Sequence, residues 1–135
     1  MTNDEAKLHL RENAAPIFMH ARQIPYAMRD KVECELNRLE QEGVLTKISS
    51  SDWATAIVPI LKKNNQVKIC GDYKVTVNAA LKVDRYPLPK PQDIFASLAG
   101  GQKFTKIDLR QAYLQCPVDE ETGSILAWNT HKGLY

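Results

Sequence analysis

Asp108 is the residue whose type and surroundings most directly suggest chemistry. It lies between the apolar residues Ile107 and Leu109, near the end of a stretch with the composition of a strand. Burying a carboxylate is costly unless it meets a partner or a metal ion. A strand-end aspartate can present its oxygens, together with the backbone carbonyl of Leu109, to a hard cation such as Mg²⁺. A capping or salt-bridged aspartate explains the same residue, so Asp108 alone leaves both interpretations open.

Basic residues are concentrated in the middle of the chain. The net charge is only +2, but residues 51–90 hold seven basic and three acidic groups, whereas residues 1–50 and 91–135 are each slightly acidic. Clustered cations attract polyanions, so one interpretation is a phosphate-facing surface, and a solvated lysine-rich face is the other. The seven basic residues are Lys62, Lys63, Lys68, Lys74, Lys82, Arg85 and Lys90.

The composition excludes several classes of protein. With 135 residues, 44% of them hydrophobic, the chain suits one globular domain. No apolar run approaches the roughly 18 residues of a membrane span, and the first twenty residues do not resemble a signal peptide. Three widely spaced cysteines favour neither a disulfide framework nor a Cys-x-x-Cys metal site. We therefore expect an intracellular, non-secreted protein without a membrane partner; cytoplasm and nucleus stay open.

The amino-terminal half contains the elements that must position the basic residues. After a weakly periodic arm, residues 25–42 show helical apolar spacing and end at Gly43. Residues 56–62 and 66–72 predict a hairpin around Asn64-Asn65, for which a two-residue turn is plausible because asparagine tolerates positive φ. Pro59 predicts an edge position or a bulge. Alternation places Lys68 on the face opposite Val67 and Ile69.

The carboxyl-terminal half must position Asp108. Prolines make residues 86–91 an extended connector, and Pro91 suits the first turn of a helix that ends at Gly100-Gly101. A strand over residues 103–109 and a short helical turn over 110–114 follow. Residues 119–123 separate two further strands, of which the last, 125–130, turns at residues 131–133.

Six sequence blocks occur in an order and spacing typical of one family. The chain resembles the amino-terminal part of the reverse transcriptase of gypsy-type LTR retrotransposons, found in the pol polyprotein, from about Ile24 to its last residue. The blocks are Ser51-Asp52-Trp53-Ala54 with Val58-Pro59-Ile60-Leu61-Lys62-Lys63, then Val67-Lys68-Ile69-Cys70-Gly71-Asp72-Tyr73-Lys74, Asn78, Asp84-Arg85-Tyr86-Pro87-Leu88-Pro89, Phe104-Thr105-Lys106-Ile107-Asp108-Leu109 with Ala112-Tyr113, and Thr130-His131-Lys132-Gly133-Leu134-Tyr135.

The resemblance implies an α+β fold, namely the fingers and partial palm of a right-hand polymerase. It implies a mainly antiparallel sheet with one long and one short helix, truncated at its carboxyl end. Residues 1–23 would be an amino-terminal arm, residues 24–90 a fingers-like region, and residues 91–135 the incomplete beginning of a palm-like region.

The resemblance also assigns site residues. Asp108, with the Leu109 carbonyl, would help to hold the two Mg²⁺ ions that activate the primer hydroxyl and stabilise the leaving pyrophosphate. Lys68, an arginine in many relatives, and Lys63 would contact the incoming dNTP as point charges. The backbone amides of Gln111 and Ala112 would meet the triphosphate. Tyr113 would exclude a ribose 2′-hydroxyl, although a buried core tyrosine is an open alternative.

The implied activity is RNA-directed DNA polymerisation. Its partners would be an RNA or DNA template-primer, dNTP, and the rest of the pol polyprotein with palm, thumb and RNase H. The family's Tyr-x-Asp-Asp motif does not occur in these residues. Because one carboxylate cannot hold two Mg²⁺ ions, we expect a polymerase fragment that is inactive alone. A domesticated or degenerate remnant that acts as a nucleic-acid or protein interaction module is the alternative, and a decayed fragment without a role stays open.

Overall fold

A hairpin of two strands forms one side of the only sheet within residues 5–83 and 86–135, the residues that this computed structural model describes. β1 (Thr55–Leu61) pairs antiparallel with β2 (Val67–Gly71) on one side and parallel with β3 (Trp128–Thr130) on the other. β4 (Gly133–Leu134) pairs antiparallel with β3. The order is therefore β2-β1-β3-β4, and the predicted α+β class with a mainly antiparallel sheet is confirmed.

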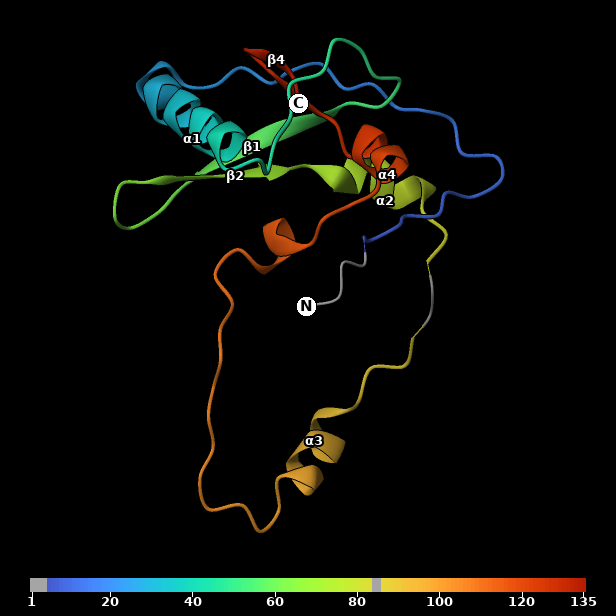
Figure 1. Cartoon of the computed structure of the whole chain (residues 1–135), viewed down its shortest axis with the longest axis vertical. Helices are drawn as coiled ribbons and strands as arrows, with labels where there is room; N and C mark the ends of the chain where they lie inside the picture. The colour runs from blue at the N-terminus through green and yellow to red at the C-terminus, as the bar shows by residue number, and fades with distance from the viewer. Residues whose placement is uncertain (1–4, 84–85) are drawn as a thin grey trace.

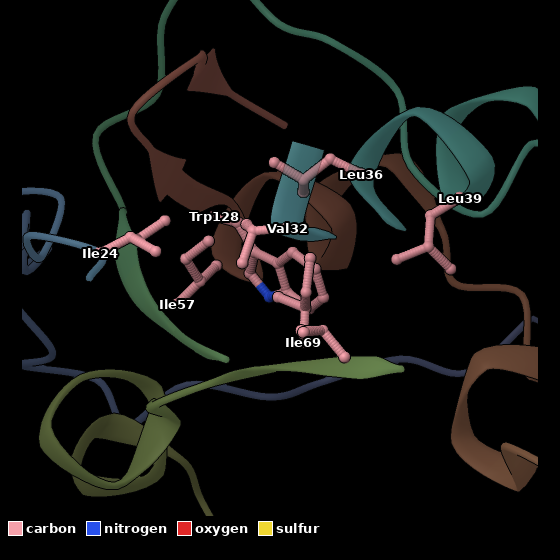
Figure 2. Packing of buried hydrophobic residues seen from close by; sticks show 8 residues of the cluster. Ile24, Val32, Leu36, Leu39, Ile57, Ile69 and Trp128 are labelled. Carbon is pink, nitrogen blue, oxygen red and sulfur yellow. The ribbon is translucent and has the colours of Figure 1, made fainter. Parts of the chain in front are cut away.

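The predicted long helix is confirmed. It begins with a short 3₁₀ turn, η1 (Tyr26–Met28), which leads into α1 (Arg29–Gln41). The apolar stripe of α1, formed by Val32, Leu36 and Leu39, is at most 1% exposed. Figure 2 shows this stripe packed against Ile57, Ile69 and Trp128 from the sheet. Burying each such side chain contributes about 1.5–3 kcal/mol, so this contact fixes the hairpin against α1.

The hairpin turn differs from the predicted two-residue turn. The amide of Lys62 donates to the Gln66 carbonyl at 2.7 Å, and the amide of Asn65 donates to the Lys62 carbonyl at 3.0 Å. Asn65 has a φ of +62°. The loop is thus three residues long, a turn followed by one left-handed residue, which is the next most common hairpin geometry. The prediction of positive φ at an asparagine was right, and the loop length was wrong.

Pro59 occupies the position that the sequence predicted. It lies opposite Ile69 in the register of the two strands. The strands form hydrogen bonds at Lys62 and at Ala56, whose carbonyl accepts from the Asp72 amide, and such bonds occur at every second residue, so Pro59 is at a position without one. Its nitrogen therefore points away from β2. β3 pairs only with Thr55 and Ala56, so this part of β1 is an open edge where a missing donor costs nothing.

Short helices connect and flank the strands. They are η2 (Tyr73–Val75), α2 (Val77–Ala80), α3 (Pro91–Ser97), η3 (Ala112–Gln115) and α4 (Glu120–Ile125). The start of α3 at Pro91 and the extended connector over residues 86–90 are confirmed. The expectation of only one short helix is wrong, because α2, α3 and α4 are all short α-helices.

Two predicted strands do not form where they were expected. Residues 103–109 have no regular structure, since no described strand lies beside them to supply backbone partners. Residues 120–125 are helical instead of separating two strands. The Asp119 carboxylate caps this helix by accepting from the Thr122 amide at 3.0 Å. Hydrogen bonding by the Thr122 side chain, and then by its amide, lowers the pKa of Asp119 below its usual value. The last strand is consequently reduced to Trp128–Thr130, although its predicted turn and return pairing are present.

A long excursion leaves the body between α2 and η3. Figure 1 shows it extending away from the sheet, with α3 near its far end. Every described residue between 86 and 110 is exposed. The apolar face predicted for α3 lies on this excursion; Ile94, Phe95 and Leu98 are 45%, 71% and 46% exposed. This face therefore packs on no described part of the chain.

The amino-terminal arm packs against a second core cluster through Leu8, Leu10, Ala14 and Ile17. Single β-bridges join Ala6 to Val118, Leu10 to Leu81 and Phe18 to Ala54. Within the described ranges, no helix combines the length and apolarity required to cross a membrane. The thiols of Cys34, Cys70 and Cys116 are all free.

Candidate functional site

The β1–β2 hairpin presents three of the predicted basic residues. Lys62 and Lys63 lie at its turn, Lys68 lies on β2, and all three are exposed. Lys68 pairs in register with Ile60, whereas the buried Val67 and Ile69 face α1. Lys68 therefore projects from the sheet face opposite α1, as its alternation with Val67 and Ile69 predicted.

The other predicted basic residues do not join this group. Lys74 lies in η2 and Lys82 follows α2, at the opposite end of β2 from the hairpin turn (Figure 1). Lys90 precedes α3 on the excursion. Arg85 lies outside the described residues. The single basic cluster expected from the sequence is therefore divided, and only Lys62, Lys63 and Lys68 share one hairpin.

A pocket of about 370 Å³ lies beside the hairpin turn. Its walls come from three separate segments: the polar side of α1, the turn with Lys62, Asn65 and Gln66, and the residues Arg110 and Gln111. This arrangement brings Gln111, a predicted dNTP contact, to the same pocket as Lys62. It does not include Lys63 or Lys68.

Gln111 begins the segment that carries the remaining predicted nucleotide contacts. Its φ of +51° is uncommon for a residue with a side chain, and such geometry clusters at functional sites. The first bond of η3 runs from the Leu114 amide to the Gln111 carbonyl at 2.9 Å, so the amides of Ala112 and Tyr113 have no partner within this turn. Tyr113 is 93% exposed, and the alternative of a buried core tyrosine is excluded.

Asp108 and Leu109 lie on the excursion and are both exposed. The described residues contain no group of three or more histidine, cysteine, aspartate or glutamate side chains that could hold a metal ion. Mg²⁺ requires about six oxygen ligands in octahedral geometry. One exposed carboxylate and one carbonyl do not meet this requirement, so the residues present do not fit a two-Mg²⁺ site by themselves.

Two structural features near the hairpin were not predicted. The first is an ion pair between Asp72, at the end of the hairpin, and Arg22 of the amino-terminal arm. The polar side of α1, with Lys31, Glu35 and Arg38, was not recognised as a pocket wall. The spacing of Glu35, Arg38 and Glu42 is a helical ion-pair pattern that could have indicated it.

Comparisons with known proteins test the family resemblance independently of the structure. No protein-family model matches the chain. It is 43% identical to an uncharacterized protein of Caenorhabditis elegans over 99% of its length. It is 29% and 28% identical to the retrovirus-related Pol polyproteins of the Drosophila melanogaster transposons 297 and opus, over 90% and 96% of its length. The chain spans only 11% to 13% of these relatives.

A solved structure has a similar fold. The protease-reverse transcriptase of prototype foamy virus superposes with a TM-score of 0.76 at 19% identity, over 90% of this chain and 16% of that one. Two of these sequence relatives are retrotransposon Pol polyproteins, and the resemblance predicted from the six blocks is confirmed.

Proposed function

Because the chain is homologous to a segment of retrotransposon Pol polyproteins, we propose that it is the nucleotide-facing part of a reverse transcriptase. In this proposal residues 24–90 are the fingers and residues 91–135 begin the palm. The observation that carries the proposal is the hairpin, which holds Lys62, Lys63 and Lys68 exposed on a strand pair fixed to α1. Because the backbone of the hairpin is held in place, less conformational entropy is lost when a lysine side chain binds a phosphate.

Within this function each residue has a distinct role. Lys63 and Lys68 neutralise the phosphates of an incoming dNTP as point charges. The amides at Gln111 and Ala112 donate to the triphosphate. The ring of Tyr113, which is exposed, is the proposed contact with the sugar that discriminates deoxyribose from ribose. An RNA or DNA template-primer and the remaining palm, thumb and RNase H of the Pol polyprotein are the proposed partners.

Asp108 and the Leu109 carbonyl enter the proposal as part of a larger ligand set. Two bound Mg²⁺ ions would supply activation of the primer hydroxyl and charge neutralisation. The further oxygen ligands would have to come from outside the described residues.

Affinity for a fluorescently labelled dNTP, measured by anisotropy over a series of salt concentrations, tests this proposal. Lys63→Gln and Lys68→Gln should each weaken dNTP binding and lower the slope of log affinity against log salt, because each removes one cation from the triphosphate. Lys47→Gln is the matched control, because Lys47 is also exposed but lies outside the hairpin. Equal affinity and slope for all four proteins would contradict the proposal.

A protein-interaction module is the second candidate, favoured by one observation. The excursion exposes large apolar side chains, among them Phe95 at 71% and Ile107 at 80%. Such surfaces mark contacts with other protein. A module of this kind would not bind a dNTP with a salt dependence that the hairpin lysines control, so the same titration separates the two functions.

A further inference from the structure

The pocket between α1 and the hairpin turn has an excess of positive charge. Its walls carry Lys31, Arg38, Lys62 and Arg110 against the acidic residues Asp30 and Glu35. Whether this excess is available to a ligand depends on which of these charges are already neutralised within the protein.

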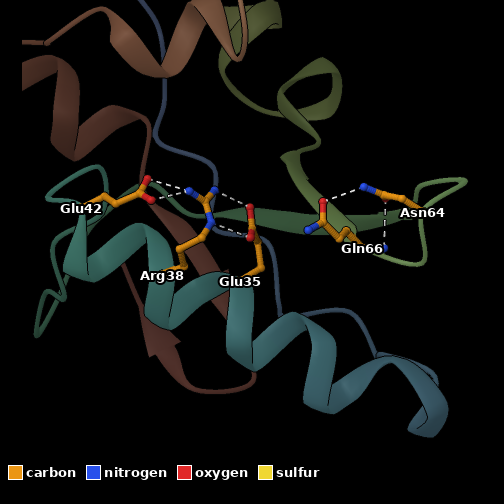
Figure 3. A network of polar contacts seen from close by, with 5 residues as sticks. All are labelled: Glu35, Arg38, Glu42, Asn64 and Gln66. Carbon is orange, nitrogen blue, oxygen red and sulfur yellow. Dashed lines mark hydrogen bonds and ion pairs between the residues drawn. The ribbon is translucent and has the colours of Figure 1, made fainter.

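Arg38 is neutralised within the pocket wall. Figure 3 shows its guanidinium between two carboxylates of the same helix. It donates to Glu35 at 2.7 and 2.8 Å and to both oxygens of Glu42 at 2.6 Å. These bonds raise the pKa of Arg38 further above its already high value, and because two carboxylates share one guanidinium, the three groups together keep a net negative charge. Neither Arg38 nor Glu35 is then available to a ligand.

The remaining cations keep their charge. Lys31 donates to the side-chain oxygen of Asn65 at 2.6 Å, and an amide neutralises nothing. Lys62 and Arg110 form no ion pair within residues 5–83 and 86–135. Asp30 and the surplus carboxylate charge on Arg38 oppose these three cations, which leaves an excess of one positive charge. The local field at the pocket is therefore positive, and an anion is the matching ligand.

We infer that this pocket binds a phosphate group, carried either by a nucleic-acid strand or by a nucleoside triphosphate. The three cations come from a helix, a hairpin turn and a third segment, so a ligand that bridges them is held in more than one direction. The pocket volume, about 370 Å³, exceeds that of a phosphate and admits the attached sugar. The nature of the phosphate donor rests on the proposed function; the anion site itself rests on the charges.

This site is distinct from the proposed contact at Lys68. Lys31 and its neighbours lie on the α1 side of the hairpin, whereas Lys68 projects from the opposite sheet face. The hairpin would thus hold phosphate on both of its faces. Because the two faces carry different lysines, a substitution can remove one site and leave the other intact.

The test is direct binding to two probes, a short fluorescent single-stranded oligo(dT) and fluorescently labelled dTTP. Lys31→Gln and Lys62→Gln remove charge, and glutamine at position 31 retains a donor for Asn65. We expect each substitution to weaken the binding of one of the probes by about two- to fivefold at low salt. Asp30→Asn should strengthen the same probe, and Lys47→Gln should change neither. Loss confined to oligo(dT) identifies a strand phosphate, and loss confined to dTTP identifies a triphosphate.

Unchanged affinity of both probes in Lys31→Gln and Lys62→Gln would overturn the inference, and so would equal weakening by Lys47→Gln. Lys68→Gln distinguishes this failure from failure of the proposed function. If only Lys68→Gln weakens binding, the pocket is refuted and the proposed function stands. If only the pocket variants weaken binding, the phosphate pocket stands and the role of Lys68 fails. Thermal melts of every variant ensure that the compared proteins are folded.

Discussion

The indole nitrogen of Trp128 donates a hydrogen bond to the hydroxyl of Tyr73 over 2.6 Å, which joins the end of β2 to β3 across the core. The Tyr73 hydroxyl in turn donates to the Leu126 carbonyl at 2.9 Å. Because Trp128 also packs against α1, these two residues couple the orientation of the hairpin to the rest of the sheet. The position of the hairpin lysines thus depends on a contact far from them in sequence.

Tyr73→Phe should destabilise the fold by about 1–3 kcal/mol at neutral pH, because it leaves the buried Trp128 donor without a partner. It should also alter the response to alkali. Burial raises the pKa of Tyr73 to about 12, whereas an unfolded tyrosine titrates near 10. The folded chain therefore retains the proton longer, and its stability falls as the pH rises from about 10 to 12.

Urea unfolding at a series of pH values measures both effects. Wild-type stability should fall more steeply than that of Tyr73→Phe above pH 10. Absorbance titration of tyrosinate provides a second check, because the pKa of Tyr73 is raised to about 12 and Tyr73→Phe should remove this late step. Identical slopes of stability against pH for the two proteins would show that ionisation of Tyr73 does not cause the loss of stability in alkali.

Gly71→Ala should destabilise the chain by about 1–3 kcal/mol, because a Cβ at this position overlaps its neighbours. It would lie 2.7 Å from the Trp128 indole nitrogen and 2.8 Å from the Tyr73 ring. Gly123→Ala is the matched control, since its nearest neighbour would be Val118 at 3.9 Å and alanine favours the helix α4. Equal melting temperatures for the two variants would mean that Gly71 is not closely packed.

The sequence predicted those elements whose signals are local. The stripe of α1, Pro91 at the start of α3 and the alternation around Lys68 each lie within one segment, and all three predictions are correct. Residues 103–109 were predicted as a strand because their composition suits one, but a strand also needs a neighbour, which composition does not report. At residues 119–125 the Asp119 cap was read as a polar turn, although an aspartate before acidic residues also begins a helix.

The candidate site was less predictable than the fold. Lys68 and the exposed Tyr113 could be placed from alternation and from the resemblance. The pocket could not, because it joins α1 to Arg110 and Gln111, segments separated by most of the chain. Such long-range juxtaposition depends on packing and leaves no periodic trace in the sequence.

The exposed apolar excursion should cause self-association of the isolated chain at micromolar concentration. Phe95→Ser and Ile107→Ser should reduce the sedimentation-average mass without lowering the melting temperature, because both side chains lie on the surface. Leu36→Ser is the contrasting variant: its side chain is fully buried, so it should lower the melting temperature instead. A wild-type chain that sediments as one monomeric species would contradict this prediction.

The 135-residue polypeptide should not extend a primer in the presence of Mg²⁺ and dNTP. Asp108 is exposed, and the described residues offer it no companion carboxylates. Primer extension resolved on a denaturing gel measures this, with Asp108→Asn as the control for contaminating polymerase. Incorporation by the wild-type chain that is lost in Asp108→Asn would show that a complete site forms without further ligands.

Mapping of photo-cross-links tests the central claim most directly, because it identifies the residues that touch nucleic acid. A primer-template carrying 5-iodouracil is irradiated with the purified chain, and the adducts are located by peptide mass spectrometry. The account predicts adducts within the hairpin residues 62–68 and within residues 110–113, reduced by competing unlabelled primer-template. Adducts confined to other segments, or none above those of an unrelated basic protein, would contradict the claim that this surface faces the nucleic acid.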